Sequence, residues 1–371
     1  MSYKVCSRCV MDNLSDSSIR FDEYGNCNYC NDALIARDSM YFPNEEGKRR
    51  LDAMFSMLKE KGKGKKYDCM IGFSGGLDSS YVCYLAYKYG LRVLAIHIDD
   101  GLDAPVTTQN IHRVVNTFKF DLIVEKPNKE QFADLTRSFI YAGLPDIAIP
   151  QDNVLFACIY KYAKENGIEY LLSGENFTLE CITQSGFDAS DKVHIKDVHK
   201  KYGKLKLDGQ LPLYSIFEKR FKYKMLHKIQ TLKPLYLIDY NAEKALKELS
   251  EACGYEYYGN KHWESRFTKF LQVYYLPNKF NIDKRKSHYS SLVISGQMTR
   301  DEALQKLNEP LYDENEMQLE LDFLLKEMEI NKSDFERLMQ EKPNKHENFK
   351  TSRLNKLAQF VMRLRKKVLG Y

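Results

Sequence analysis

The chain has 371 residues, of which 43% are hydrophobic and 29% are charged, and 56 Lys and Arg residues against 51 Asp and Glu residues give a net charge of +5. This composition is ordinary for a soluble protein with two or three domains, and so mild a basic balance does not by itself predict nucleic-acid binding. No apolar run approaches a membrane span, and the first residues carry no signal-peptide pattern. We therefore expect a cytoplasmic protein that makes no membrane contact.

The first feature along the chain is a pair of Cys-x-x-Cys motifs, CSRC and CNYC, which supply Cys6, Cys9, Cys27 and Cys30. Their spacing is typical of a zinc ribbon, in which four thiolates close a tetrahedral site, so we expect a structural Zn²⁺. A redox role for one pair is the alternative, which two pairs so close in sequence disfavour. We assign residues 1–43 to this zinc-ribbon-like domain and expect the other five cysteines to be buried thiols.

Residues 44–66 follow with helical spacing and a Gly-Lys linker, and from residue 67 strand-like and helix-like segments alternate. The expected strands cover residues 67–73, 91–98, 121–127 and 169–176, and the expected helices cover 79–89, 106–120, 129–141 and 151–166. Such alternation predicts an α/β fold with a parallel sheet, which binds ligands beyond the carboxyl ends of its strands. We assign residues 44–240 to this domain and interpret residues 177–225 as an irregular insertion.

Residues 241–371 are expected to be mostly helical and to contact a substrate or partner. The clearest helix covers residues 241–254, with an asparagine as N-cap and a glycine as stop. Two capping boxes predict further helix starts, at Thr299 with Glu302 and at Ser333 with Glu336. The last twenty residues carry a basic amphipathic pattern, which predicts a helix packed on its own domain. The apolar positions of that pattern are Leu354, Leu357, Phe360, Val361 and Leu364.

The most informative segment joins the first expected strand to the next helix and reads Ser-Gly-Gly-Leu-Asp-Ser-Ser, residues 74–80. A glycine-rich turn at such a junction is typical of phosphate binding, because backbone N–H groups approach an anion closely and the helix N-terminus adds partial positive charge. The Walker lysine and the G-x-G-x-x-G pattern are absent, which disfavours ordinary ATP hydrolysis and a dinucleotide site. The hydroxyls of Ser74, Ser79 and Ser80 can donate to phosphate oxygens, and Asp78 suits a magnesium ligand.

This heptapeptide resembles the PP-loop of the ATP pyrophosphatases, a family that includes GMP, NAD and asparagine synthetases. The resemblance implies an adenine nucleotide alpha-hydrolase-like (HUP) domain that breaks the α–β bond of ATP and adenylates a substrate oxygen. It also implies that backbone groups near Ala95 and Ile98 read the adenine, and that Glu175 is a second Mg²⁺ ligand facing Asp78. The nucleotide-binding residues expected on this basis are Phe73, Ser74, Gly75, Gly76, Asp78, Ser79, Ser80, Ala95, Ile98 and Gly174.

Three motifs within residues 259–304 resemble the signature of the N-acetyl sugar amidotransferases of surface-polysaccharide and flagellin-glycan biosynthesis. They read KHWESRFTKF, KFNIDKR and SGQMTRDEAL. The cysteine pairs and the loop match that family in place and order, and Asn281 departs from its usual glycine while still tolerating a left-handed backbone. The resemblance implies ATP-dependent conversion of an acetamido group on a nucleotide-linked sugar into an acetamidino group. The route implied is an O-adenylyl imidate, with release of AMP and pyrophosphate.

The same resemblance assigns roles within the second motif. Lys279, Lys284 and Arg285 would offset phosphate charge together with Mg²⁺, and Asp283 would orient these cations or the ammonia. The catalytic residues expected are Asp78, Glu175, Lys279, Asp283, Lys284 and Arg285. The chain has neither an N-terminal nucleophilic cysteine nor a G-x-C-x-G elbow, so we expect ammonia from a separate glutaminase subunit that resembles the histidine-pathway enzyme.

Two other interpretations remain. A PP-loop tRNA-modifying enzyme, a thiolase or a ligase, would place cysteines near the nucleotide, and Cys158 and Cys181 are the candidates; buried thiols are the competing explanation. A zinc-ribbon RNA-binding adaptor without catalysis would need an inactive loop, whereas Asp78 and every loop serine are present. Nucleic acid is therefore not an expected partner.

Overall fold

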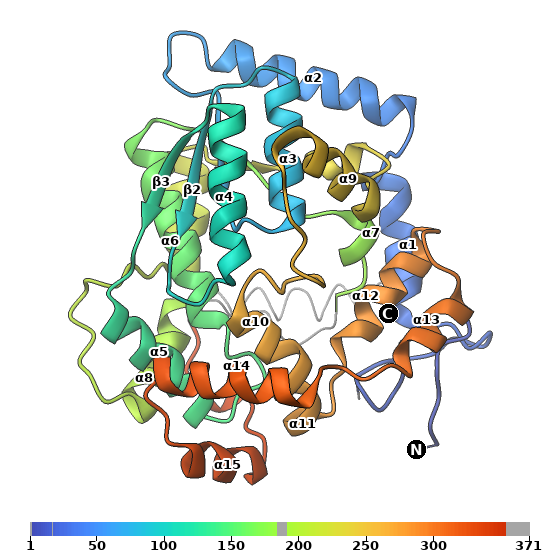
Figure 1. Ribbon diagram of the computed structural model, residues 1–371, viewed down its shortest axis with the longest axis vertical. Coiled ribbons are helices and arrows are strands. Elements are labelled where there is room, and N and C mark those ends of the chain that lie inside the picture. Colours follow the sequence, from blue (N-terminus) through green and yellow to red (C-terminus); the bar gives the residue numbers. More distant parts are fainter. Residues whose placement is uncertain (1, 17, 184–190, 354–371) are drawn as a thin grey trace.

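The computed structural model describes residues 2–16, 18–183 and 191–353, and it contains a five-stranded sheet with helices on both faces (Figure 1). The strand order is β3-β2-β1-β4-β5, and all neighbouring strands are parallel. The strands are β1 (Cys69–Gly72), β2 (Val93–Ile98), β3 (Asp121–Glu125), β4 (Tyr170–Leu172) and β5 (Gln230–Leu232). In the centre, Ile71 of β1 pairs with Ala95 of β2 and with Leu172 of β4. The predicted parallel α/β sheet is therefore confirmed.

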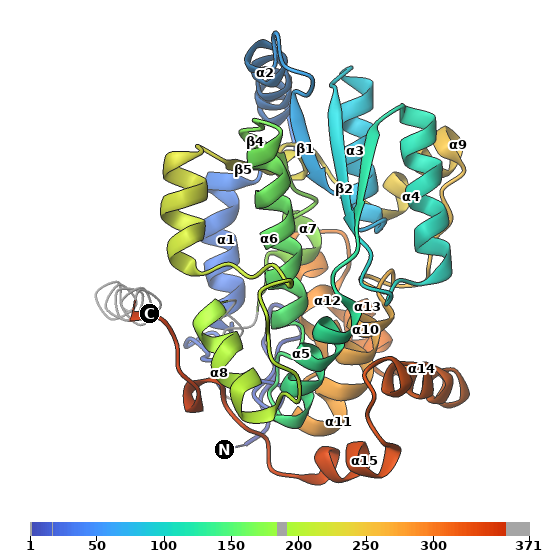
Figure 2. The same ribbon diagram turned by 90° about the vertical axis from the view of Figure 1, so that its left-hand side faces the viewer.

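Two hydrophobic cores cover the two faces of this sheet. One face packs on α2 (Glu45–Lys61), α3 (Leu77–Lys88), α4 (Pro105–Phe118) and α9 (Ala242–Cys253). The other packs on α5 (Lys129–Tyr141), α6 (Ile149–Glu165) and α8 (Lys192–Tyr202). Figure 2 shows β1 and β2 edge-on, with α3, α4 and α9 on one side and α6 on the other. Because both faces are covered, the three central strands β2, β1 and β4 are mostly buried apolar runs rather than alternating ones.

The described chain from residue 241 on is mostly helical, as expected. Its helices are α10 (Arg266–Phe270), α11 (Leu276–Phe280), α12 (Lys284–Ile294), α13 (Arg300–Leu307), α14 (Glu314–Glu327) and α15 (Lys332–Gln340), and a π-helical segment, η3 (Leu271–Tyr275), joins the first two. The predicted capping box at Thr299 is confirmed. The box predicted at Ser333 is wrong, because α15 begins at Lys332 after Asn331 and Ser333 already lies inside the helix.

The caps of α9 agree with the sequence pattern: the Asn241 side chain accepts from the N–H of Lys244, and Gly254 has a φ of 68°.

The interpretation of residues 177–225 as irregular is wrong in part, since they contain α7 (Phe177–Glu180), α8 and the π-helical η1 (Glu218–Leu226). Two short 3₁₀ helices complete the description, η2 (Pro234–Leu237) and η4 (His346–Asn348). The amphipathic pattern predicted near the C-terminus lies outside the described residues from position 354 on. The domain boundaries at 43/44 and 240/241 remain predictions.

The N-terminal segment forms a small third core with α1 (Asn28–Met40). This core contains the four cysteines of the two motifs and extends to Phe177 of α7 and Ile294 of α12. Figure 1 shows α1, α12 and α13 close together beside the sheet domain. None of the helices within the described ranges has the length and apolar character needed to cross a bilayer.

Candidate active site

The phosphate loop leaves the carboxyl end of β1 and enters α3. Gly75 has a φ of 76°, and a Cβ built there would lie 2.8 Å from the Thr107 side chain, so glycine is required. Within the loop, Ser74 Oγ accepts from the N–H of Gly76 at 3.2 Å and lies 3.1 Å from Ser79 Oγ. The loop thus presents a helix N-terminus of the kind that binds anions.

The other residues predicted to bind the nucleotide differ in accessibility. Phe73 and Ser80 are buried in the core. Ala95 is buried in the middle of β2, where it pairs with strands on both sides, whereas Ile98 ends that strand and is half-buried. Gly174 lies against the loop, because a Cβ built there would lie 2.9 Å from a backbone nitrogen of α3. The structure therefore brings Gly174 to the loop and Ile98 to the open edge of the sheet, and it places the other three in the core.

A lysine from far along the chain reaches the loop. Lys261 Nζ lies 2.7 Å from Asp78 Oδ2 and 2.9 Å from Glu180 Oε1, and its side chain is only 12% exposed. The buried hydroxyl of Tyr240 donates to the other oxygen of Asp78. Burial alone would lower the pKa of Lys261, but the two carboxylates raise it above its ordinary value, so the ammonium group stays charged. The fold thus supplies the cation that the loop itself lacks.

Residues 255–264 fold over the loop and bring a carboxylate to it. The hydroxyls of Tyr255 and Tyr258 form hydrogen bonds of 3.0 and 2.9 Å with loop backbone atoms. A Cβ built at Gly76 would lie 2.7 Å from Glu264 Oε1, while Glu264 Oε2 is buried and has no hydrogen-bond partner among the described residues. An unpaired carboxylate oxygen beside a phosphate loop is expected to bind a cation. These residues therefore fit ATP accompanied by Mg²⁺.

Glu175 follows β4, where the sequence predicts a second magnesium ligand facing Asp78. Its carboxylate forms an ion pair with Lys233, and its side chain is half exposed. The next residue, Asn176, caps α7, and Glu180 at the end of that short helix is the carboxylate that reaches Lys261. The structure thus brings Glu180 rather than Glu175 to the ion pair at the loop. The magnesium role of Glu175 remains a prediction.

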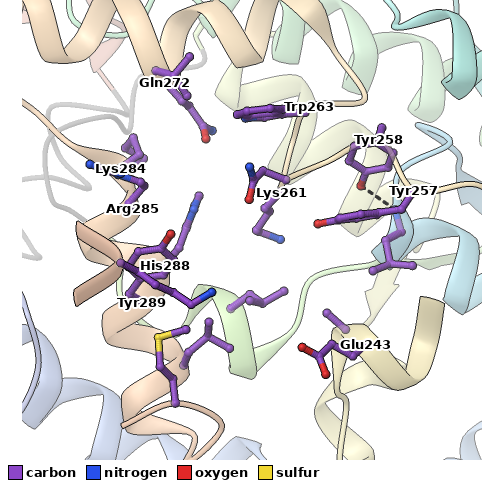
Figure 3. Close-up of a pocket in the computed structure, with 18 of the residues that line it drawn as sticks. Glu243, Tyr257, Tyr258, Lys261, Trp263, Gln272, Lys284, Arg285, His288 and Tyr289 are labelled. Carbon is purple, nitrogen blue, oxygen red and sulfur yellow. Dashed lines mark hydrogen bonds between the residues drawn. The ribbon is translucent and has the colours of Figure 1, made fainter. Parts of the chain in front are cut away.

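A cavity of about 450 Å³ opens next to Asp78. It lies between the start of α3, the start of α9, residues 257–263 and helices α12 and α13. Figure 3 shows Lys261 in the middle of this pocket, the α12 side chains on one side and Tyr257 and Tyr258 on the other. The aromatic and cationic side chains that line it are Tyr257, Tyr258, Lys261, Trp263, Lys284, Arg285, His288, Tyr289 and Lys306.

Lys284 and Arg285, two of the cations predicted to be catalytic, occupy the first turn of α12 and line this pocket, and their catalytic role remains a prediction. Burial lowers the pKa of Lys284, and the nearby Asp146 carboxylate opposes that shift. Asp283 is the N-cap of α12: its side chain accepts from the N–H of Arg285 at 2.9 Å and forms an ion pair with the Arg285 guanidinium. Asp283 therefore fixes the start of α12 and the position of the Arg285 side chain.

Lys279 belongs to the same motif but lies on α11. Its ammonium group donates to two backbone carbonyls at the C-terminal end of α15. The chain reverses between α11 and α12 at Asn281, which has a φ of 57°. This value lies in the left-handed region, which asparagine tolerates as the glycine usual in the resembled family does. The structure therefore separates Lys279 from the pocket that Lys284 and Arg285 line.

The Sγ atoms of Cys6, Cys9, Cys27 and Cys30 are buried and all lie within 4.8 Å of one another. The Sγ atoms of Cys6 and Cys30 lie 3.6 Å apart, and so do those of Cys9 and Cys27. Four thiolates at about 2.3 Å from one tetrahedral ion would be about 3.8 Å apart, so the donor set and its spacing fit zinc. Backbone N–H groups of Cys9 and Cys27 donate to Cys6 Sγ at 3.4 and 3.1 Å, which favours the thiolate that a metal requires.

This four-cysteine module is bonded to the helices that border the pocket. Arg300 of α13 donates to the carbonyl of Cys6 at 3.0 Å, and the N–H of Val10 donates to Ser290 Oγ of α12 at 3.1 Å. Ser290 lies on the same helix as Lys284. The module therefore positions one wall of the pocket although its metal ligands lie outside it.

The cysteines proposed for a thiolase differ from these four. Cys158 is fully buried in α6, and Cys181 follows α7. Burial raises the pKa of Cys158 to about 12 and that of Cys181 to about 11. Both thiols are therefore protonated near neutral pH, which is typical of inert buried cysteines and unfavourable for a nucleophile.

Sequence reasoning missed several members of the cluster at the loop. Tyr240 and Glu180 carry no motif, and only the fold brings them to Asp78. Lys261 and Glu264 belong to the KHWESRFTKF motif, and His288 lies just after KFNIDKR, so the motifs that carried the family resemblance held the missing signal.

Comparison with known proteins finds two family models that match separate parts of the chain. Residues 264–365 match the LPS biosynthesis protein WbpG-like C-terminal domain, and residues 68–176 match asparagine synthase. An uncharacterized protein of Methanocaldococcus jannaschii is 25% identical over 171 residues, which are 46% of this chain and 58% of that protein. The chain thus spans little more than half the length of this curated relative.

Two solved structures are similar at low identity. NMN synthetase from Francisella tularensis has a TM-score of 0.39 and 14% identity, over 71% of this chain and 91% of that chain. The NH3-dependent NAD synthetase from Campylobacter jejuni has a TM-score of 0.28 and 16% identity, over 36% of this chain and 58% of that chain. The two family models match the loop domain and the C-terminal motifs within one polypeptide, and this combination supports an LPS-biosynthesis, PP-loop amidotransferase-like family.

Proposed function

We propose that the chain is an ATP-dependent, AMP-forming amidotransferase that converts the acetamido group of a nucleotide-linked sugar into an acetamidino group. In this proposal a separate glutaminase subunit supplies the ammonia. One observation carries it: the pocket meets the phosphate loop at Asp78 and Lys261. A second molecule in the pocket would lie next to phosphates held by the loop, as adenylation requires.

The chemistry follows from the resistance of an amide to ammonia, since its oxygen is a poor leaving group. Attack of the amide oxygen on the α-phosphorus of ATP gives an O-adenylyl imidate and pyrophosphate, and ammonia then replaces AMP at carbon. In this proposal the N-terminus of α3 and Lys261 stabilise the leaving pyrophosphate. Asp78 and Glu264, with Glu175 as the sequence predicts, are the residues that would hold Mg²⁺, which supplies charge neutralisation on the phosphates when bound.

The pocket suits a sugar nucleotide in size and lining. Its volume of about 450 Å³ lies within the range of small-molecule sites. The rings of Trp263 and Tyr289 offer apolar faces on which a sugar can pack, and Lys284, Arg285 and Lys306 can pair with a diphosphate. The match of residues 264–365 to an LPS-biosynthesis domain supports a sugar-linked substrate.

The test combines ATP, an ammonium salt and a panel of nucleotide-linked acetamido sugars, with product read by mass and AMP and pyrophosphate measured separately. One member of the panel should show the decrease in mass that replacement of an oxygen by NH causes. AMP should form in the same molar amount as this product. Asp78→Asn should abolish the reaction, and Asp52→Asn on the exposed face of α2 should not. Failure of the whole panel, or formation of ADP in place of AMP, would refute the proposal. Product formed from glutamine by the purified chain alone would refute the separate glutaminase.

A further inference from the structure

His288 is a pocket residue to which the proposed adenylation step gives no role. It lies on α12 one turn after Lys284 and lines the cavity together with Lys261 (Figure 3). Its ring lies 6.0 Å from that of His262, and no hydrogen bond joins it to another residue in the described part of the chain. A half-buried histidine that lines a cavity and has no hydrogen-bond partner among the described residues is available to a ligand.

The second half of the proposed reaction requires a proton acceptor. The lone pair of ammonia attacks the imidate carbon, the bond from that carbon to the AMP oxygen breaks, and the oxygen keeps the electron pair. The attacking nitrogen then carries three hydrogens, whereas the acetamidinium product keeps two on it. One proton must therefore leave that nitrogen in each turnover, and a positioned base accelerates such a step.

We propose that His288 accepts this proton and that ammonia binds beside it, in the part of the pocket between α12 and Lys261. The inference rests on the proposed function and extends it to the position where ammonia binds. It requires no further co-reactant, because the proton passes from the nitrogen to the imidazole and afterwards to solvent.

The surrounding charges suit this role. Burial first, and then His262, Lys261 and Lys284, hold the pKa of His288 well below its ordinary value, so its ring is neutral. The ammonium groups of Lys261 and Lys284 repel ammonium and leave neutral ammonia, the nucleophilic form, as the species that enters. Once the phosphates of ATP are bound, their negative charge raises the basicity of the ring when the proton has to be accepted.

The carboxylates that face the pocket are less suited to accept the proton. Asp78 and Glu180 are both paired with Lys261. Glu264 lies against Gly76 on the phosphate loop, where the proposed function assigns its carboxylate to Mg²⁺. Glu243 and Glu309 line the pocket from α9 and from the segment after α13, on elements other than α12.

The two half-reactions separate the inference from the proposed function. Acceptor-dependent exchange of pyrophosphate into ATP, measured without ammonia, reports adenylation. Amidination is then measured with ammonia and with hydroxylamine, a weaker base whose adduct loses its proton more readily. The variant is His288→Gln, and the matched control is His112→Gln, an exposed histidine of α4.

We expect His288→Gln to keep its exchange rate while ammonia-dependent turnover falls by about 10²-fold or more. The loss should be smaller with hydroxylamine, and His112→Gln should match the wild type in all assays. Unimpaired transfer from ammonia in His288→Gln would overturn the inference alone. Exchange that falls as far as transfer would also overturn it, because the histidine would then serve adenylation or folding. A wild-type chain without acceptor-dependent exchange would refute the proposed function, and the inference with it.

Discussion

Replacing Lys261 by methionine would remove the ammonium group that lies between Asp78 and Glu180 and leave the two carboxylates facing each other. The two N···O distances are 2.7 and 2.9 Å, so the two oxygens lie no more than 5.6 Å apart. Two unit charges at that separation repel by about 3 kcal/mol at an effective dielectric constant of about 20. This agrees with the ~3–5 kcal/mol that loss of one partner of a buried ion pair costs. We therefore expect the free energy of unfolding to fall by about 3 kcal/mol.

Urea unfolding of Lys261→Met measures this loss, and Glu180→Gln in the same background should restore most of it by removing one of the two charges. Lys48→Met, on the exposed face of α2, should change the stability by less than about 0.5 kcal/mol. The exchange of pyrophosphate into ATP should fall by about 10²–10³-fold in Lys261→Met, the usual effect of removing one group that stabilises transition-state charge. A variant with wild-type stability and exchange would contradict both the buried ion pair and its place at the phosphates.

Three further predictions concern other parts of the molecule. Chelation of zinc, or Cys30→Ser, should lower the thermal midpoint in calorimetry. Either change should also raise the KM for the acceptor sugar, because the N-terminal cysteine module holds α12. Burial lowers the pKa of His346 to about 4, while an unfolded histidine has a pKa of about 6.5. This contribution to stability is fully present above about pH 6.5 and falls as the pH drops toward 4, by about 2 kcal/mol at pH 5. Urea unfolding should show this loss in the wild type and a smaller loss in His346→Phe, where the buried His194 still has a lowered pKa. Cys158→Ala and Cys181→Ala should each retain amidination, because neither thiol forms a thiolate at neutral pH.

The features that the sequence predicted correctly are those that short stretches of chain determine. The alternation of strand-like and helix-like segments yields the parallel sheet, because the apolar period of each segment decides its element. The glycines of the phosphate loop and the cysteine pairs are local for the same reason. Strand β5 has only three residues, two of them exposed, so it carries too little periodicity to be recognised.

The composition of the site depended on contacts between distant segments. Lys261 and Asp78 are 183 positions apart, and no local pattern predicts that their side chains meet. The KFNIDKR motif shows the opposite problem, because residues that are neighbours in sequence need not share a surface. The left-handed Asn281 ends α11 and reverses the chain, so Lys279 turns toward α15 while Lys284 enters the pocket. The cation at the loop therefore comes from KHWESRFTKF rather than from the motif that the sequence analysis favoured.

The contacts between the four-cysteine module and α12 give a physical reason for the closed metal site that these cysteines predict. Helix α12 carries Lys284 and His288, and a helix of 11 residues is only marginally stable without packing against the rest of the fold. Lys286 on the same helix forms an ion pair with Asp12 and donates to Ser15 Oγ at 2.7 Å, both within the N-terminal module. A tetrahedral site that fixes two turns of backbone is stiffer than a loop of the same length, so it can hold that helix in one orientation. If the module serves this purpose, loss of zinc should impair the pocket before it impairs the phosphate loop, which is built on β1 and α3.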